Sequence, residues 1–583
     1  MRLWSIALCL AAACSSPPAK DTGPRLPPKQ RPGTVTLTII GTNDLHGALD
    51  RLPWIAGYLV NLRAARAADG GGVILLDGGD MFQGTLESNI AEGADVVRAY
   101  NAMEYTATAV GNHEFDYGPE GPATTPQSIE DDARGALKAR AREAKFPMLV
   151  ANISDATSGE RIKWPNMPPS VLVESAGIKV GIIGASTEST PFTTMPANFA
   201  GLVMKPPPAV AIAAESKRLR EQGAALVLVT THIGSKCTDF EHPNDLSTCE
   251  TNEELFKLIG DLPKGSVDVI VAGHTHAGIA HRINDIAVIE SFANGKAFGR
   301  IDVRIAADGR VTAVKIHPPR AVCAGETVDR PIAAKDCQPG DYEGKPVVPE
   351  PAVGKIVDEA IARAKVRREE RLGVTLTGKI DKSYGSESVQ GNWVTDMMLA
   401  TRPEGQVAVT NGGGLRADIP GGDLTYGQLF EAMPFDNRYA IVDVKGSHLR
   451  SLVSTNLQRG GGILSWGGLT AKGRCKAGKL DLEIKVAGKP LDENKAYKLV
   501  TSDFLASGGD GLIGRLKLAP NAIKITDVII RDAIADHLRK HKGSVDPAKL
   551  FSPANRRLDY EGSRPVSCAP KTPQKPTDQE PPE

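Results

Sequence analysis

Seven residues of metal-ligand type lie in five short segments of this 583-residue chain. They are Asp44, His46, Asp80, Asn112, His232, His274 and His276. Four segments follow runs of apolar, largely β-branched residues, and the third follows the weaker run Ala107–Val110. Such runs are typical of buried parallel strands, whose carboxyl ends gather ligand-binding loops at one edge of a sheet. We therefore expect these oxygen and imidazole donors to converge on two divalent metal ions.

The spacing of these donors suits phosphoryl chemistry. Asp80 follows a Gly-Gly turn, where its carboxylate could bridge two cations, and Asn112 adds a neutral oxygen that still leaves room for an anionic substrate. We expect Asp44 and His46 on one face of an extended tip, because residues i and i+2 of a strand point the same way. Two ions about 3.5–4 Å apart can polarise a phosphoryl oxygen and generate hydroxide near neutral pH. Such a site accepts Zn, Mn, Co or Mg, so the metal stays open.

His113 and Asp116 directly follow the amide ligand Asn112. If the chain turns helical there, residues i and i+3 sit together. The carboxylate would then orient the imidazole, which could stabilise a transition state or protonate a leaving group.

The elements that must position these residues form a layered α/β domain. Strand-like runs alternate with helical patterns over residues 54–68, 128–144 and 210–222. Three later runs, at 287–291, 299–305 and 311–316, are expected to be antiparallel strands that close the sheet. The predicted organisation is a signal peptide over 1–14, a tether over 15–33, an α/β domain over 34–318, a linker with a connecting helix over 319–371, a second mixed domain over 372–560 and a disordered tail over 561–583.

The N-terminus has the pattern of an export signal. Arg2 is followed by the apolar stretch Leu3–Ala13 and then by Cys14, which resembles a bacterial lipoprotein signal apart from Ala11, where leucine is usual. We expect the protein outside the cytoplasm, periplasmic or at the cell surface, and lipid-anchored to the membrane at Cys14. Ordinary secretion is the alternative. Lys plus Arg and Asp plus Glu each number 69, so no basic field favours a nucleic acid polymer as partner.

Six cysteines remain beyond Cys9 and Cys14, an even number that suggests disulfides in an exported chain. Cys237 with Cys249, and Cys323 with Cys337, are plausible bridges because each pair is close in a loop-like sequence. Cys475 and Cys568 would then pair by default.

The order of the five segments, DxH, GGD, GNHE, THxG and GHTH, resembles that of the calcineurin-like dimetal phosphoesterases. The longer segments 111–116 and 411–416 resemble the 5'-nucleotidase / UDP-sugar hydrolase family, and the likeness spans about residues 35–557. It implies a four-layer α/β sandwich followed by a smaller, mixed α/β 5'-nucleotidase C-terminal domain. It also implies one ion held by Asp44, His46, Asp80 and His276, a second held by Asp80, Asn112, His232 and His274, and a catalytic dyad of His113 and Asp116.

The second domain carries three segments suited to a nucleotide, at 411–416, 433–437 and 502–511. Aromatic rings can stack on a base, a carboxylate can accept bonds from ribose, and arginine can bind phosphate with two donors. By the resemblance, Phe435 and Phe504 stack the base. The resemblance also implies substrate binding by Asn411, Arg416, Asn437 and Asp510.

One segment departs from the family. Its nucleotidases carry additional arginine where residues 384–392 of this chain hold none. Arg416 could suffice, Lys382 could reach in, or the preferred substrate is not a plain nucleoside monophosphate. By the resemblance, the 319–371 connector would be a hinge that carries substrate inward.

Three functions stay open at this point. The first is an exported phosphohydrolase of nucleotides, acting as a 5'-nucleotidase, nucleotide-sugar hydrolase or 2',3'-cyclic phosphodiesterase. The second is a thiosulfohydrolase of the same fold, against which the two rings and Asp510 argue. The third is a non-catalytic surface-binding lipoprotein, which would not need an intact ligand set.

Overall fold

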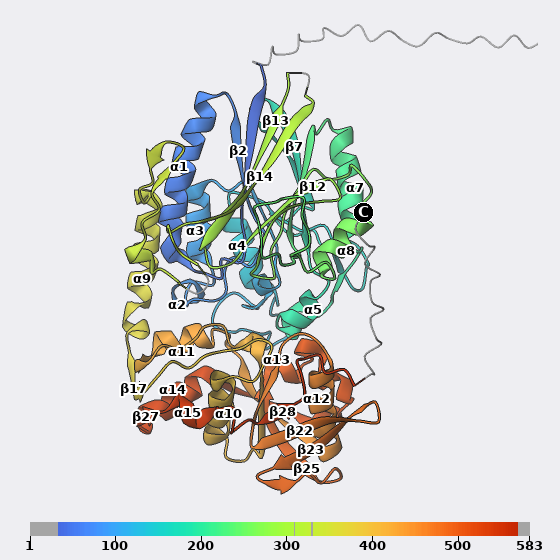
Figure 1. Cartoon of the computed structure of the whole chain (residues 1–583), viewed down its shortest axis with the longest axis vertical. Helices are drawn as coiled ribbons and strands as arrows, with labels where there is room; N and C mark the ends of the chain where they lie inside the picture. The colour runs from blue at the N-terminus through green and yellow to red at the C-terminus, as the bar shows by residue number, and fades with distance from the viewer. Residues whose placement is uncertain (1–32, 308, 328–329, 569–583) are drawn as a thin grey trace, which may run out of the picture.

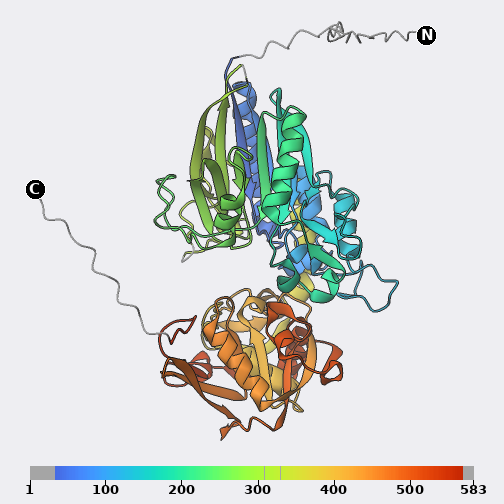
Figure 2. The ribbon, with the colours of Figure 1, turned by 90° about the vertical axis from the view of Figure 1, so that its right-hand side faces the viewer.

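The protein folds into two α/β domains stacked end to end, as a computed structural model shows for residues 33–307, 309–327 and 330–568 (Figures 1 and 2). The predicted signal peptide, nearly all of the tether and most of the predicted tail lie outside the described residues. Within the described chain, no helix combines the length and apolar character needed to cross a membrane.

The first domain contains two six-stranded mixed sheets. The first sheet has the order β14 (Val311–Ala321), β13 (Ala297–Ile305), β1 (Val35–Thr42), β2 (Gly72–Asp77), β3 (Ala107–Ala109) and β4 (Met148–Leu149). The second has the order β11 (Gly278–Ile283), β12 (Ile286–Ser291), β10 (Val269–Val271), β9 (Leu226–His232), β7 (Ile178–Ser186) and β6 (Ser170–Ser175). Strands β1 to β4 are parallel, as are β7, β9, β10 and β12. The carboxyl ends of both parallel sets therefore bear the predicted metal-binding segments.

The two sheets pack face to face and are covered by helices on their outer faces. Alternate residues of the strands, such as Leu37 and Ile39 of β1 and Leu226 and Leu228 of β9, fill the layer between the sheets. Helices α1 (Leu52–Ala68) and α3 (Ala94–Met103) cover the first sheet, and α7 (Pro208–Glu221) and α8 (Glu254–Asp261) cover the second. The predicted four-layer sandwich is confirmed.

Two local expectations were wrong. The pattern over 128–144 forms only α4 (Gly135–Glu143), because the Asp131 carboxylate accepts the amides of Gln127 and Ser128 and folds that stretch into a turn. The three later strands do not close one sheet. β12 joins the second sheet, parallel to β10, whereas β13 and β14 extend the first.

The connecting helix α9 (Pro351–Arg368) runs along the first domain beside α1 and α3 (Figure 1). Arg98 of α3 donates to Glu359 of α9 over 2.9 Å, and Arg363 of α9 pairs with Asp95 of α3. Short strands β15 (Asp341–Tyr342) and β16 (Lys345–Pro346) precede the helix. These ion pairs attach α9 to the first domain, so the chain passes into the second domain just after Arg368.

The second domain is built on a five-stranded sheet with two smaller sheets beside it. The large sheet has the order β21 (Leu464–Gly467), β18 (Val407–Asn411), β25 (Ala496–Ser502), β20 (Arg438–Lys445) and β26 (Ile523–Ile529). The smaller sheets are β19 (Gly422–Thr425), β17 (Arg371–Leu376) and β27 (Gly543–Val545), and β24 (Lys489–Pro490), β23 (Lys479–Val486), β22 (Leu469–Lys476) and β28 (Leu558–Tyr560). The helices are α10 (Val389–Thr401), α11 (Tyr426–Ala432), α12 (Gly446–Gln458), α13 (Asp503–Ala506), α14 (Ile530–Lys540) and α15 (Pro547–Leu550).

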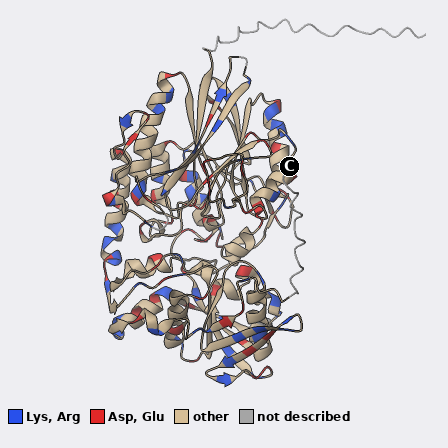
Figure 3. Ribbon diagram, viewed as in Figure 1, with Lys and Arg blue, Asp and Glu red and all other residues tan. Residues whose placement is uncertain are grey.

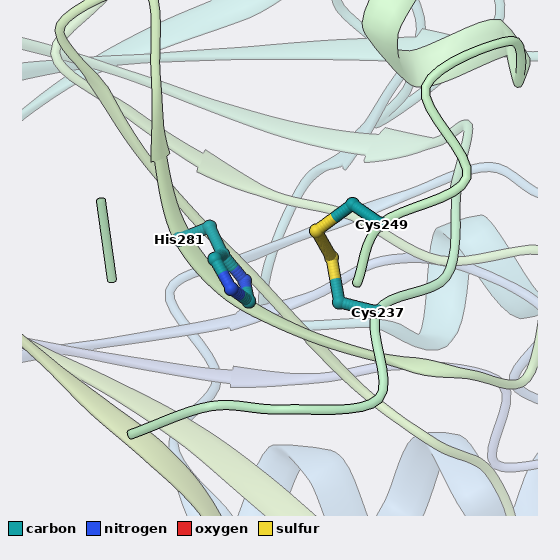
Figure 4. Close-up of side chains that lie close together, drawn as sticks. All are labelled: Cys237, Cys249 and His281. Carbon is teal, nitrogen blue, oxygen red and sulfur yellow. A yellow bond between two sulfur atoms is a disulfide. The ribbon is translucent and has the colours of Figure 1, made fainter. Parts of the chain in front are cut away.

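Three disulfides join the six cysteines in the predicted pairs, 237–249, 323–337 and 475–568. His281 lies beside the first bridge, but both sulfurs are bonded to each other and offer no thiolate to a metal (Figure 4). Basic and acidic residues are interspersed along the ribbon of both domains (Figure 3), in keeping with the balanced composition.

Candidate active site at the domain junction

All seven predicted ligands lie at the carboxyl ends of parallel strands, at the edge of the sandwich that faces the second domain (Figure 1). They follow β1, β2, β3 and β10, except for His232, which is the last residue of β9. Five of the seven are buried, and His274 and His276 are partly exposed. The topology therefore brings together residues that are up to 232 positions apart in the sequence.

The ligand backbones are strained rather than extended. Positive φ angles between 50° and 88° occur at Asp44, His46, Asp80, His274 and His276. This left-handed region is uncommon for residues with a Cβ, and it concentrates at functional sites where the surrounding structure enforces it. The expectation of an extended Asp-x-His tip was therefore wrong, although the two side chains do reach the same point.

One group of donors is formed by Asp44, His46 and His276. The Nε2 atoms of His46 and His276 are 2.9 Å apart, and His276 Nε2 lies 3.3 Å from Asp44 Oδ1. Asp80 Oδ2 lies 3.8 Å from His46 Nε2, on the side that faces the remaining ligands.

A second group surrounds His232. Its Nε2 lies 3.0 Å from Asp80 Oδ2, 3.1 Å from Asn112 Oδ1 and 3.2 Å from His274 Nδ1. The Asn112 amide donates to the carbonyl of Thr193, which directs its oxygen toward the group. Asp80 is therefore the carboxylate that both groups share, as expected of a bridging ligand.

The donor set fits divalent cations. His46 Nδ1 lies 2.8 Å from the carbonyl of Gln83, and His232 Nδ1 lies 2.9 Å from that of Gly78. Each carbonyl fixes a proton on Nδ1 and leaves the Nε2 lone pair directed into the site. Asp44 Oδ1 is buried without a hydrogen-bond partner. Acceptors gathered in this way are costly to bury unless a cation compensates them. The roles of individual ligands stay a prediction.

Burial and neighbouring charge compete at these groups. Burial raises the pKa of Asp44, but His276 outweighs it and holds the pKa below its usual range. Burial lowers the pKa of His232, but the Asp80 carboxylate outweighs it and raises the pKa to about 10. Burial, together with the charge of His232, lowers the pKa of His274 to about 3. An imidazole must be deprotonated to ligate a cation, so metal binding at His232 competes with a proton.

His113 and Asp116 lie together beside this cluster. The chain does turn helical there, as a 3-10 helix over His113–Phe115, and His113 Nδ1 lies 2.5 Å from Asp116 Oδ2. Thr194 Oγ1 donates to the other Asp116 oxygen over 2.8 Å. Burial lowers the pKa of His113, but Asp116 and Asp80 outweigh it and raise the pKa. This is the geometry of an imidazole oriented by a carboxylate.

Sequence reasoning missed Glu114, whose buried carboxylate holds two ligand loops in place. Its Oε2 accepts the amides of Asp80 (2.9 Å) and Gly111 (2.6 Å), and its Oε1 accepts the amide of Met81 (2.7 Å). The only sequence signal was its position between the dyad residues. Glu290 of β12 has a similar place behind the His-x-His loop, where it accepts bonds from the amide and hydroxyl of Thr275.

Arg416 is the second-domain residue that enters the metal cluster. Its Nη2 lies 3.1 Å from His46 Nε2 and 3.5 Å from His276 Nε2. The ring of Phe435 lies 5.8 Å from the Arg416 guanidinium and stacks on His113 at 5.3 Å. A cation and an aromatic ring from the second domain thus face the predicted metal site and dyad directly.

The other predicted substrate residues lie farther into the second domain. Asn411 donates to Asp510 over 2.9 Å, and Asn437 lines a small pocket with Phe435. Phe504 packs against the second-domain core. The sandwiching of a base between the rings of Phe435 and Phe504 stays a prediction.

Within the segment that lacks arginine, Glu387 has a structural role. Its carboxylate accepts the amides of Arg557 and Leu558, both over 2.9 Å, and so anchors β28 instead of facing the site. The Lys382 side chain is exposed, and its reach into the site stays a prediction.

Two family models match the chain, calcineurin-like phosphoesterase over residues 37–278 and 5'-nucleotidase, C-terminal domain over residues 361–515. The chain belongs to the two-domain 5'-nucleotidase family. It is 25% identical to Protein UshA of Yersinia enterocolitica over 543 residues, 87% of this chain and 92% of that protein. It is therefore a hydrolase of the metallophosphoesterase class, a family that implies divalent metal ions.

Solved structures share this family fold. A 5'-nucleotidase precursor from Thermus thermophilus is similar with a TM-score of 0.69 at 24% identity, covering 90% of this chain and 99% of that one. The sulfate thiohydrolase SoxB of Thermus thermophilus is similar with a TM-score of 0.67 at 16% identity, covering 93% and 98%. Since the two proteins carry different names for their activities, the fold alone does not select the substrate.

Proposed function

We propose that this member of the 5'-nucleotidase family is an exported dimetal phosphohydrolase that releases phosphate from nucleotides. One observation carries the proposal. Arg416 of the second domain and the seven-ligand cluster of the first domain converge on one point, although 370 positions separate Arg416 from His46. Imidazole nitrogens and carboxylates can bind metal ions. A guanidinium on the opposite side can bind the phosphate that those ions polarise.

The first domain would supply the chemistry. Two bound divalent ions would make water nucleophilic near neutral pH and polarise the phosphoryl oxygen. One would be held by Asp44, His46, Asp80 and His276, and the other by Asp80, Asn112, His232 and His274. Asp116 keeps a proton on His113 Nδ1, so His113 Nε2 is the atom that can stabilise the transition state or protonate the leaving group.

The second domain, over about 372–560, would read the nucleotide. Arg416 is placed to bind the reacting phosphate, and Phe435 and Phe504 are the candidates for stacking on the base. A movement of the second domain relative to the first would carry the bound nucleotide toward the predicted metal ligands. We propose that the movement occurs near residues 368–371, because ion pairs hold α9 on the first domain.

We further propose that the enzyme works outside the cytoplasm. Three disulfides support an oxidising compartment. Lipid attachment at Cys14, which lies outside the described residues, is the proposed tether. Processing at this cysteine is tested by mass spectrometry of the mature N-terminus.

The test is phosphate release from AMP, UDP-glucose, 2',3'-cyclic AMP and bis(p-nitrophenyl) phosphate with Mn, Co or Zn. We expect metal-stimulated release from at least one nucleotide. An enzyme that is inactive on the whole panel while fully loaded with metal would contradict the proposal.

A further inference from the structure

The loop over residues 433–437 joins α11 to β20 and connects the second domain to the first. The Phe435 ring stacks on His113, with 29° between the ring planes. The carbonyl of Pro434 accepts a bond from the Asn89 side chain over 3.3 Å. Asn89 is itself held by the Tyr117 hydroxyl, 3.0 Å from its Oδ1. The loop therefore touches the first domain at two points, one of which is the predicted dyad.

Arg531 of α14 holds this loop from behind. Its Nη1 donates to the carbonyls of Met433 (3.1 Å) and Phe435 (3.4 Å), and its Nη2 pairs with the Asp436 carboxylate. Its Nε donates to the Tyr426 hydroxyl over 3.2 Å. Arg531 is 3% exposed, so its charge is almost wholly withdrawn from water.

The carbonyls of the 433–437 loop connect the buried Arg531 guanidinium to the first domain. Two loop carbonyls, at 433 and 435, point inward to the guanidinium, and the one between them, at 434, points outward to Asn89. The last loop residue is also fixed, because the amide of Ile530 donates to the carbonyl of Asn437 over 2.9 Å. Guanidinium is suited to this arrangement because its planar donors serve several acceptors at once, whereas an ammonium is a point charge.

We propose that Arg531 is a positioning residue that presets the 433–437 loop, so that Phe435 meets His113 and the nucleoside when the domains close. The role of Phe435 toward a nucleoside rests on the proposed function. The docking of the loop on the first domain does not.

The kinetic test compares Arg531→Lys with wild type on AMP and on p-nitrophenyl phosphate, which lacks a nucleoside. Loss of the outer partners that orient metal ligands typically costs about 10–100-fold, and we expect the same range for a group that orients Phe435. We expect kcat/KM for AMP to fall within this range, mainly through KM, while p-nitrophenyl phosphate changes less than about 3-fold. Arg539→Lys, on the same helix but paired with Glu370 and Asp536, is the matched control. Equal losses on both substrates, or none on AMP, would overturn the proposal.

A second readout needs no substrate. Amide hydrogen exchange in Arg531→Lys should rise over 433–437 and also in the first-domain peptides around Asn89 and His113, because docking is lost. Exchange that rises only in the second domain would show that Arg531 stabilises its own domain without positioning the loop on the first, and would overturn the proposal. This outcome does not depend on whether the wild type hydrolyses AMP. If Arg531→Lys does not fold, Asp436→Asn, which removes the acidic partner on the loop, should raise exchange at the same first-domain peptides. No rise there would also overturn it.

Discussion

At the scale of residues, the candidate site is a set of acceptors held in unfavourable conformations. Five ligands have left-handed backbones, each costing about 1–3 kcal/mol. Glu114 and Glu290 bond the amides of the loops that carry these ligands. The residue types and spacing of the ligands could be recognised in the sequence. The left-handed backbones of these ligands could not be predicted from the sequence. They depend on the carboxylates of Glu114 and Glu290, and no local sequence pattern shows which loop amides these carboxylates bind.

Asp80 is the residue whose loss should matter most, because its carboxylate lies between both donor groups. Mutating groups that merely orient a ligand costs about 10–100-fold, so Asp80→Asn should lower kcat/KM for nucleotides by more than about 100-fold. Metal content per chain should fall as well. The exposed Asp527→Asn variant is the control, and a metal-loaded, active Asp80→Asn enzyme would refute the shared-ligand assignment.

Glu114→Gln tests whether the carboxylate behind the ligands positions them. The substitution replaces one acceptor oxygen with an amide donor that would face the N–H groups of Asp80 and Gly111 or of Met81. We expect metal affinity to fall about 10–100-fold while the protein stays folded. Metal titration followed by calorimetry measures this. Unchanged affinity would mean that the loops keep their shape without the carboxylate.

At the scale of elements, Asp302 of β13 joins three strands of the first sheet. It accepts bonds from Thr38 of β1, Arg300 of β13 and His317 of β14. Burial raises its pKa, but these partners outweigh it and hold the pKa below the usual range. Because the folded-state pKa is lowered, the stabilisation is present above the unfolded-state pKa of about 3.9 and is lost as pH falls below it.

Asp302→Asn should therefore lower the free energy of unfolding by about 1–3 kcal/mol at pH 7. The difference from wild type should shrink as the pH falls below about 4, where the carboxyl of the unfolded wild type begins to bind a proton while the folded one stays charged. Urea unfolding at pH 7 and pH 3.5 measures both values. A difference that does not depend on pH would show that packing, and not charge, accounts for the effect.

The sequence predicted the layered α/β architecture because buried parallel strands are continuous apolar runs. It did not predict which sheet β12, β13 and β14 join, since strand pairing between distant segments leaves no local pattern. The turn at 127–131 was missed for a different reason, because one side chain, Asp131, decides it. The contact of Phe435 with His113 depends on domain docking, which no local sequence pattern encodes.

At the scale of the whole molecule, Arg368 at the end of α9 holds the domains together. It pairs with Glu87 of α2 (Leu86–Asn89) in the first domain over 2.5 Å and with Glu431 of α11 in the second over 2.8 Å. Burial raises the pKa of Glu431. The positive charge of Arg368 lowers it, whereas the negative charge of Glu87 raises it further. Without the arginine, two carboxylates would face each other across the junction.

Arg368→Ala should thus shift the protein toward a more open arrangement, at a cost to closure of about 1–3 kcal/mol. Small-angle scattering should report a larger radius of gyration, and kcat/KM for nucleotides should fall. Arg450→Ala, which breaks an ion pair with Glu493 inside the second domain and away from residues 368–371, is the control. Unaltered scattering and kinetics would show that other contacts hold the junction.

We propose that two metal ions at the strand ends are required for phosphate release. The direct test measures the metal content per chain by elemental analysis. Phosphate release from AMP is measured on the same protein before chelation of the metal, after chelation and after the metal is restored. We expect two ions per chain, no release after their removal, and recovery when Mn, Co or Zn is restored. Undiminished release from protein shown to be free of metal would contradict a dimetal mechanism.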